Sequence, residues 1–185
     1  IAGFGCSSSQ SKITGIVTGG EDEQLLLERL DVNKTSVVDS IQVGPDGAFS
    51  VKLQIEEPEL YILRNSEGAI INLLVSPGEQ ITLESSQESF GRGYQVHGSE
   101  ESEGIRILVE QLQSTRHVLD SLQTEAGSIG DPESPQMDLI RNAYAQAIIQ
   151  QNRFTIKYLL DNMGSLSSVY ALYQKYDNDN LVLGR

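Results

Sequence analysis

The chain has 185 residues, of which 38% are hydrophobic and 21% are charged, a composition typical of a soluble globular protein. Acidic residues outnumber basic ones by 26 to 13, which gives a formal net charge of −13 at pH 7. Because this charge repels phosphate backbones and anionic membrane surfaces, we expect no nucleic-acid partner and no electrostatic docking to a membrane.

The N-terminal stretch IAGFGCSSSQS carries the only cysteine, Cys6, ahead of any periodic segment. A single cysteine excludes an intrachain disulfide, a CxxC redox pair and a thiolate-rich zinc site. Small Gly5 before the cysteine and the serine run after it resemble the lipobox of bacterial lipoproteins. That resemblance implies a diacylglycerol anchor on the sulfur of Cys6, a periplasmic location at a cell-envelope membrane, and residues 1–11 as signal-peptide remnant and tether. The alternative is a disordered tail with an incidental thiol.

From Lys12 to about Gly98 the apolar residues recur with period two, which predicts β-strands. Phe49, Val51, Leu53 and Ile55 share one face, and we expect Val37, Ile41 and Val43 to share a face of the preceding strand. Turn residues separate the segments. Residues 12–98 are therefore expected to form an antiparallel β-sandwich or open barrel of about eight strands. The expected strands cover 13–18, 24–30, 37–43, 48–55, 60–64, 69–75, 80–85 and 94–97.

After Gly98 the apolar spacing becomes helical. Ser99 is a candidate N-cap, and three glutamates follow it in a position that suits the positive end of a helix dipole. Two long helices are expected, over 104–125 and 136–162, with a short third helix over 165–176. The predicted fold class is α+β, a sandwich followed by an α-helical hairpin, with 99–185 as a helical linker region.

Each long helix carries an apolar stripe, and a two-helix hairpin cannot bury both stripes completely on itself. The sandwich, a further domain of the protein or the helices of a second copy would cover the remainder. We expect a homodimer through these helices, with Tyr144 and Ile148 on the shared stripe.

Several motifs, in this order, resemble a known bacterial family. They resemble the N-terminal domain of unknown function of Bacteroidetes thioredoxin-like lipoproteins (ResA/TlpA-like, AhpC/TSA-type thiol–disulfide oxidoreductases). The stretch Leu159–Ser165, with Tyr170–Leu172 after it, is similar to the linker that precedes their redox domain. The resemblance implies that a thioredoxin-like domain, or its protein substrates, are the partners. The motifs are Val38–Ile41, Asp46–Ser50, Glu57–Leu63, Ser76–Leu83 and Val96–Ser99.

No residue set in the chain specifies a reaction. The two histidines, His97 and His117, have no cysteine or serine partner at motif spacing, and no CxxC occurs within the 185 residues. We therefore expect no catalytic residue, no metal and no cofactor, and no enzyme activity from this chain alone. The expected function is a non-enzymatic accessory module of a lipid-anchored periplasmic thioredoxin-like oxidoreductase. A free-standing cell-envelope lipoprotein that binds a peptide or glycan is the alternative.

Overall fold

The structure is a computed structural model that describes residues 10–31, 34–177 and 180–183. The expected anchor, Cys6, lies outside these residues. The chain divides into two compact units, Ile1–Arg106 and Ile107–Arg185. The division falls inside a helix, eight residues after the boundary at Gly98 that the change of periodicity suggested.

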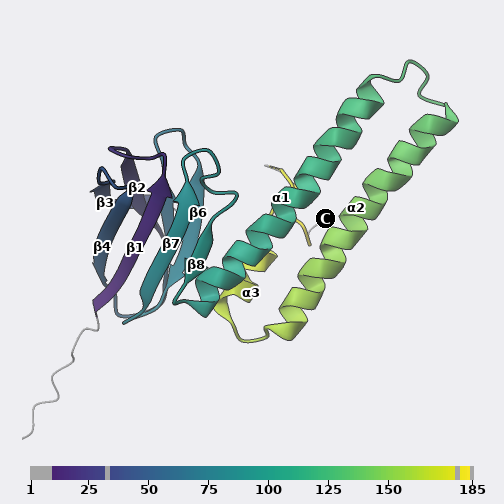
Figure 1. Cartoon of the computed structure of the whole chain (residues 1–185). Helices are drawn as coiled ribbons and strands as arrows, with labels where there is room; N and C mark the ends of the chain where they lie inside the picture. The colour runs from purple at the N-terminus through teal and green to yellow at the C-terminus, as the bar shows by residue number, and fades with distance from the viewer. Residues whose placement is uncertain (1–9, 32–33, 178–179, 184–185) are drawn as a thin grey trace, which may run out of the picture. The chain divides into compact units, whose positions relative to one another are not determined.

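In the part of the chain that the structure describes, the first unit contains eight strands in two four-stranded open sheets (Figure 1). One sheet has the order β4-β1-β7-β8 and the other the order β3-β2-β5-β6. The expected eight-strand layout is confirmed, and the three helices that follow make the fold α+β. The strands are β1 Gln10–Thr18, β2 Gln24–Asp31, β3 Lys34–Gln42, β4 Ala48–Gln54, β5 Glu59–Arg64, β6 Ile70–Val75, β7 Gln80–Ser86 and β8 Gln95–His97.

One strand pair departs from the antiparallel arrangement that we expected. β1 runs antiparallel to β4 but parallel to β7, with Lys12 opposite Gln80 and Thr18 opposite Ser86. A parallel pair requires a long connection between its strands. Here that connection is the whole of β2 to β6, so the first sheet is mixed.

The two sheets enclose one hydrophobic core. The alternation expected for β4 is confirmed, because Phe49, Val51, Leu53 and Ile55 are all 4–5% exposed. The ring of Phe49 lies over Gly15 of β1: a Cβ placed on that glycine would be 2.6 Å from the Phe49 Cε1 atom. Glycine at this point therefore allows the two strands to enclose an aromatic side chain.

The expectation for Val37 is wrong. Ile41 and Val43 are buried, at 6% and 0% exposed, but Val37 is 62% exposed. The pairing of β3 with β2 shifts by one residue, because Asp39 faces Leu27 whereas Val37 faces Glu28. This β-bulge inserts one extra residue, and an insertion of one residue moves the following side chains to the opposite face.

Helix α1, Glu100–Gly127, begins inside the first unit. The Ser99 hydroxyl accepts a hydrogen bond from the Ser102 backbone N–H at 3.3 Å, which confirms Ser99 as the cap. The hydroxyls of Ser99 and Ser102 also donate to the Leu74 carbonyl of β6, at 3.1 and 2.8 Å. These bonds tie the first turn of α1 to a sheet edge, which explains why the unit includes it.

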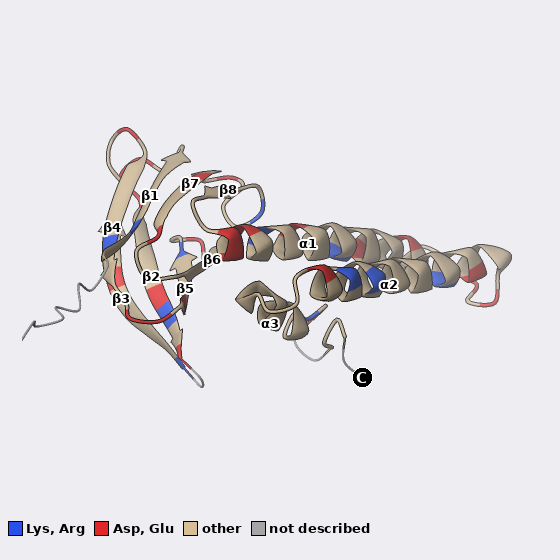
Figure 2. Ribbon diagram, turned by 90° about the horizontal axis from the view of Figure 1, so that it is seen from below, with Lys and Arg blue, Asp and Glu red and all other residues tan. Residues whose placement is uncertain are grey.

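The second unit contains the rest of α1 together with α2, Pro135–Asp161, and α3, Leu166–Leu172. Helix α3 ends four residues earlier than the sequence suggested. Figure 2 shows the acidic first turn of α1 and the basic positions along α2. Among the described helices, none is both long and apolar enough to cross a bilayer.

A buried polar cluster joins α1 to α2. The Thr115 hydroxyl donates to the Gln151 Oε1 atom at 2.7 Å, and the Gln151 Nε2 atom donates to the Thr155 hydroxyl at 3.2 Å. Gln151 and Thr155 are both fully buried. Because a buried amide that loses its partners is costly, this cluster favours one register of the helical hairpin.

Candidate functional site

Helix α3 buries its small residues, two of them serines, and exposes large apolar ones. Ser167, Ser168 and Ala171 are 2%, 8% and 0% exposed. On the other side, Val169 is 50% exposed, Leu172 is 48% exposed, and the C-cap residue Tyr173 is 73% exposed. A surface helix of an isolated globular protein has the opposite arrangement. We call Val169, Leu172 and Tyr173 the α3 face.

Hydrogen bonds to the end of α2 fix α3 in this orientation. The Ser168 hydroxyl donates to the Asn162 carbonyl at 2.7 Å, and the Tyr158 hydroxyl donates to the Ser167 hydroxyl at 2.9 Å. Ser165 is the N-cap and accepts from the Ser168 backbone N–H at 3.3 Å. Turning α3 to bury its apolar side would leave these hydroxyls without partners, so the exposed face follows from satisfied polar groups.

The α3 face is mainly apolar. It has no charged side chain, and two of its three residues are aliphatic. Clusters of exposed apolar residues on a monomer mark interaction sites, and covering them gains about 25 cal/mol per Å². An exposed tyrosine at the edge of such a cluster is typical of interface anchors.

The residues predicted at a helix interface, Tyr144 and Ile148, lie beside the chain's own C-terminal segment. The Tyr176 hydroxyl donates to the Asn152 Oδ1 atom at 2.8 Å and lies 3.3 Å from the Ile148 carbonyl oxygen. Burial raises the pKa of Tyr176, and the neighbouring Tyr144 adds to this effect. Tyr144 itself is 45% exposed.

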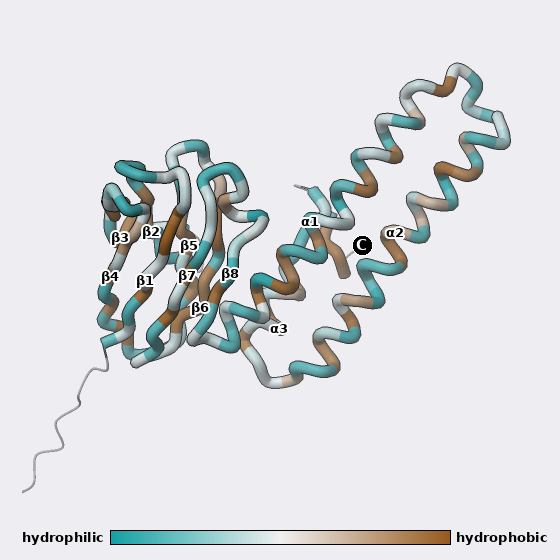
Figure 3. Tube along the Cα trace, viewed as in Figure 1, coloured by the Kyte–Doolittle hydropathy of each residue, from teal (hydrophilic) through white to brown (hydrophobic). Residues whose placement is uncertain are grey.

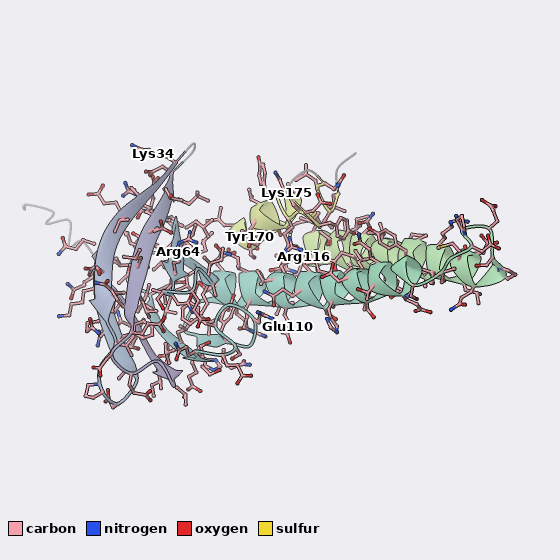
Figure 4. The ribbon with its side chains drawn as sticks, turned by 90° about the horizontal axis from the view of Figure 1, so that it is seen from above. Lys34, Arg64, Glu110, Arg116, Tyr170 and Lys175 are labelled. Carbon is pink, nitrogen blue, oxygen red and sulfur yellow. The ribbon has the colours of Figure 1, made fainter. Side chains whose placement is uncertain are left out.

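Helix α1 also contacts this C-terminal segment, through Arg116. The Arg116 Nε atom donates to the Tyr176 carbonyl at 2.9 Å, and its guanidinium also donates to the Lys175 carbonyl. Figure 4 shows Arg116 directed toward the backbone at Lys175. Both long helices therefore contact the segment that follows α3.

The two histidines belong to different units of the chain. His97 lies on β8 in the first unit and His117 lies on α1 in the second, and both are exposed. An open hollow of about 590 Å³ beside His97 is acidic, with Glu79 and Glu100 among its lining residues. Among the residues that the structure describes, no three His, Cys, Asp or Glu side chains are arranged to hold a metal ion.

One known protein family matches the first unit of the chain. Residues 11–105 match the family described as the domain of unknown function DUF4369, which is 95 of the 185 residues. The chain belongs to the DUF4369 family. The match covers the eight strands, except for the first residue of β1, and the first turn of α1, and it ends close to the division between the two units. Among curated proteins, none matches the chain.

The chain also matches parts of several solved structures. A structure of (S)-allantoin synthase has a TM-score of 0.37 and 15% identity over 51% of this chain and 45% of its own. A DUF3823 family protein from Parabacteroides merdae has a TM-score of 0.28 and 23% identity, over 43% and 44%. A 9R-lipoxygenase from Cyanothece has a TM-score of 0.30 and 11% identity, over 89% and 33%. The chain thus spans less than half the length of each of these structures.

Proposed function

We propose that this DUF4369 chain is a non-enzymatic accessory module of a lipid-anchored periplasmic thioredoxin-like thiol–disulfide oxidoreductase. In this role the sandwich and the helical hairpin hold and orient the redox domain. The α3 face is the surface to which that domain docks. The lipid on Cys6 keeps the assembly at the membrane.

The exposed α3 face is the observation that carries this proposal. It lies in the part of the second unit whose sequence resembles the linker that precedes a redox domain. A linker that only spaces two domains has no reason to expose a valine, a leucine and a tyrosine at 48–73%. Because buried hydroxyls fix the orientation of α3, the face is ready for a partner without refolding of the linker.

Reading the gene past Arg185 provides the first test. We expect a thioredoxin-like domain with a CxxC motif in the same reading frame. An immediate stop codon would refute the accessory role in this protein and would favour the free-standing binding lipoprotein.

Titration of that downstream domain, produced separately, into the chain provides the second test. Isothermal calorimetry should give saturable binding to the chain and at least roughly tenfold weaker binding to a Val169→Asp, Leu172→Asp variant. The control is Val37→Asp, which places the same charge on an exposed β3 residue far along the chain. Equal binding by both variants would refute the assignment of the α3 face.

A further inference from the structure

The chain that follows α3 folds back on itself and is held against both long helices. We call residues 174–177, which directly follow α3 and its cap, the strap. The Tyr176 N–H donates to the Asn180 carbonyl and the Val182 N–H donates to the Gln174 carbonyl, both at 2.8 Å. Figure 3 shows this segment between α1 and α2. The strap is therefore a defined element of the second unit.

The strap crosses the helical hairpin at the level of the buried polar cluster. On α1, Arg116 donates to two successive strap carbonyls, and it directly follows Thr115 of that cluster. On α2, the Asn152 Oδ1 atom accepts from the Tyr176 hydroxyl at 2.8 Å, and Asn152 directly follows Gln151 of the cluster. One level of the hairpin is therefore connected twice, inside by the cluster and outside by the strap.

The strap also fixes the C-terminal end of α3. The Gln174 backbone N–H donates to the Ala171 carbonyl at 3.4 Å, and the two residues are 6% and 0% exposed. The N-terminal end of α3 is fixed by the hydrogen bonds of Ser167 and Ser168 to the end of α2. With both ends held, the α3 face keeps one orientation relative to the hairpin.

One buried atom makes the closed strap less stable than its contacts alone would make it. Among the residues that the structure describes, the Gln174 Oε1 atom has no hydrogen-bond partner, although Gln174 is only 6% exposed. Burying an unpaired acceptor is unfavourable, and opening the strap removes that penalty because water then reaches the amide. In the cluster, by contrast, the amide oxygen and nitrogen of Gln151 are both bonded. The strap should therefore open more readily than the hairpin.

We propose that residues 174–177 are a releasable strap, which fixes α3 to the hairpin when closed and opens as a unit while the hairpin stays folded. Arg116 is the positioning residue of the closed state, because one planar guanidinium reaches two successive carbonyls. For the α3 face, the closed strap is the state in which the docking surface is preorganised. That consequence rests on the proposed function, whereas the strap itself is tested on the chain alone.

Amide hydrogen exchange, followed by NMR on the full chain, measures opening of the strap. The Tyr176 and Val182 amides should exchange more slowly than unstructured backbone, but at least roughly tenfold faster than the Thr155 amide in the hairpin. Exchange of the first two at the unstructured rate would show that no strap forms. Equal protection of all three amides would show that the strap opens only when the hairpin unfolds. Either result overturns the proposal.

Two substitutions should shift this opening in opposite directions. Arg116→Gln removes both carbonyl contacts and should speed exchange of the Tyr176 and Val182 amides by at least roughly tenfold. Gln174→Met removes the unpaired amide oxygen and should slow the same exchange roughly fivefold. Arg116→Lys keeps the charge but lacks the planar fork, so its exchange rate should lie between those of Arg116→Gln and the parent chain.

Arg153→Gln is the matched control, because it removes the same charge from an exposed position of α2. The Thr155 amide should stay protected in every variant, which separates opening of the strap from loss of the fold. If Arg116→Gln speeds exchange no more than Arg153→Gln does, or if Gln174→Met does not slow it, the proposal is wrong. None of these measurements involves a redox domain, so their failure is distinct from failure of the calorimetric test of the α3 face.

Discussion

Truncation of Phe49 to alanine tests the phase of β4 and the position of the core. Phe49 is 5% exposed, and its ring lies over Gly15 in the mixed sheet. Removing the ring takes roughly 130 Å² of apolar contact area out of the core, which costs about 3 kcal/mol at about 25 cal/mol per Å². The cavity left by the ring increases this loss of stability by about 1 kcal/mol for each ~40 Å³ that the surrounding side chains do not fill.

Collapse around this cavity is limited, because β1 is hydrogen-bonded to β4 on one side and to β7 on the other. We therefore expect Phe49→Ala to lower the free energy of unfolding of the sandwich by about 4 kcal/mol, within the usual range for a buried aromatic residue. That is a large part of the 5–15 kcal/mol that is typical of a domain.

Urea unfolding followed by circular dichroism or tyrosine fluorescence measures this effect, since the chain contains no tryptophan. Val37→Ala is the control: its side chain is 62% exposed, and its effect should stay within about 0.5 kcal/mol. If the urea midpoint of Phe49→Ala equals that of the control, the ring is not in the core. The assignment of the inward-facing side of β4 would then be wrong.

Three further predictions concern the anchor, the chemistry and the pH dependence. A fatty-acid probe should label the native precursor but not its Cys6→Ser variant, and equal labelling of both would exclude Cys6 as the attachment site. Insulin reduction by the purified chain should stay at background, because disulfide exchange needs a reactive thiolate and a resolving partner; turnover that survives Cys6→Ser would reveal an unrecognised site. Burial, and then the hydrogen bond and charge of Glu59, raise the pKa of Tyr61 above its ordinary value of about 10. Above about pH 10 the native state keeps a proton on Tyr61 that the unfolded chain loses. The contribution of Tyr61 to the free energy of unfolding is therefore fully present below about pH 10 and is lost as the pH rises further. Tyr61→Phe should make this fall shallower, and an unchanged slope in alkaline urea titrations would contradict the assignment.

The candidate sites show what the sequence could and could not indicate. Cys6 stands out in the sequence because it is the only cysteine and precedes every periodic segment. The α3 face did not stand out, because apolar residues at helical spacing ordinarily predict a buried side. The signal was present in the serines at positions 167 and 168, but only the hydrogen bonds to Asn162 and Tyr158 show that these serines lie inside.

The sequence by itself determined the elements. Period-two alternation located the strands, the inward phase of β4 and the sandwich core, and Ser99 marked the start of α1. These features depend on neighbours a few residues apart, which a single sequence displays directly.

The tertiary structure alone decided how the elements pair and which faces stay exposed. The parallel register of β1 with β7 and the bulge that turns Val37 outward depend on strands far apart in the chain. The exposed sides of α2 and α3 likewise depend on what packs against the opposite side of each helix. A helix with apolar residues on two sides has the same sequence pattern whichever side is buried. Only its packing against the other helix of the hairpin determines which side that is.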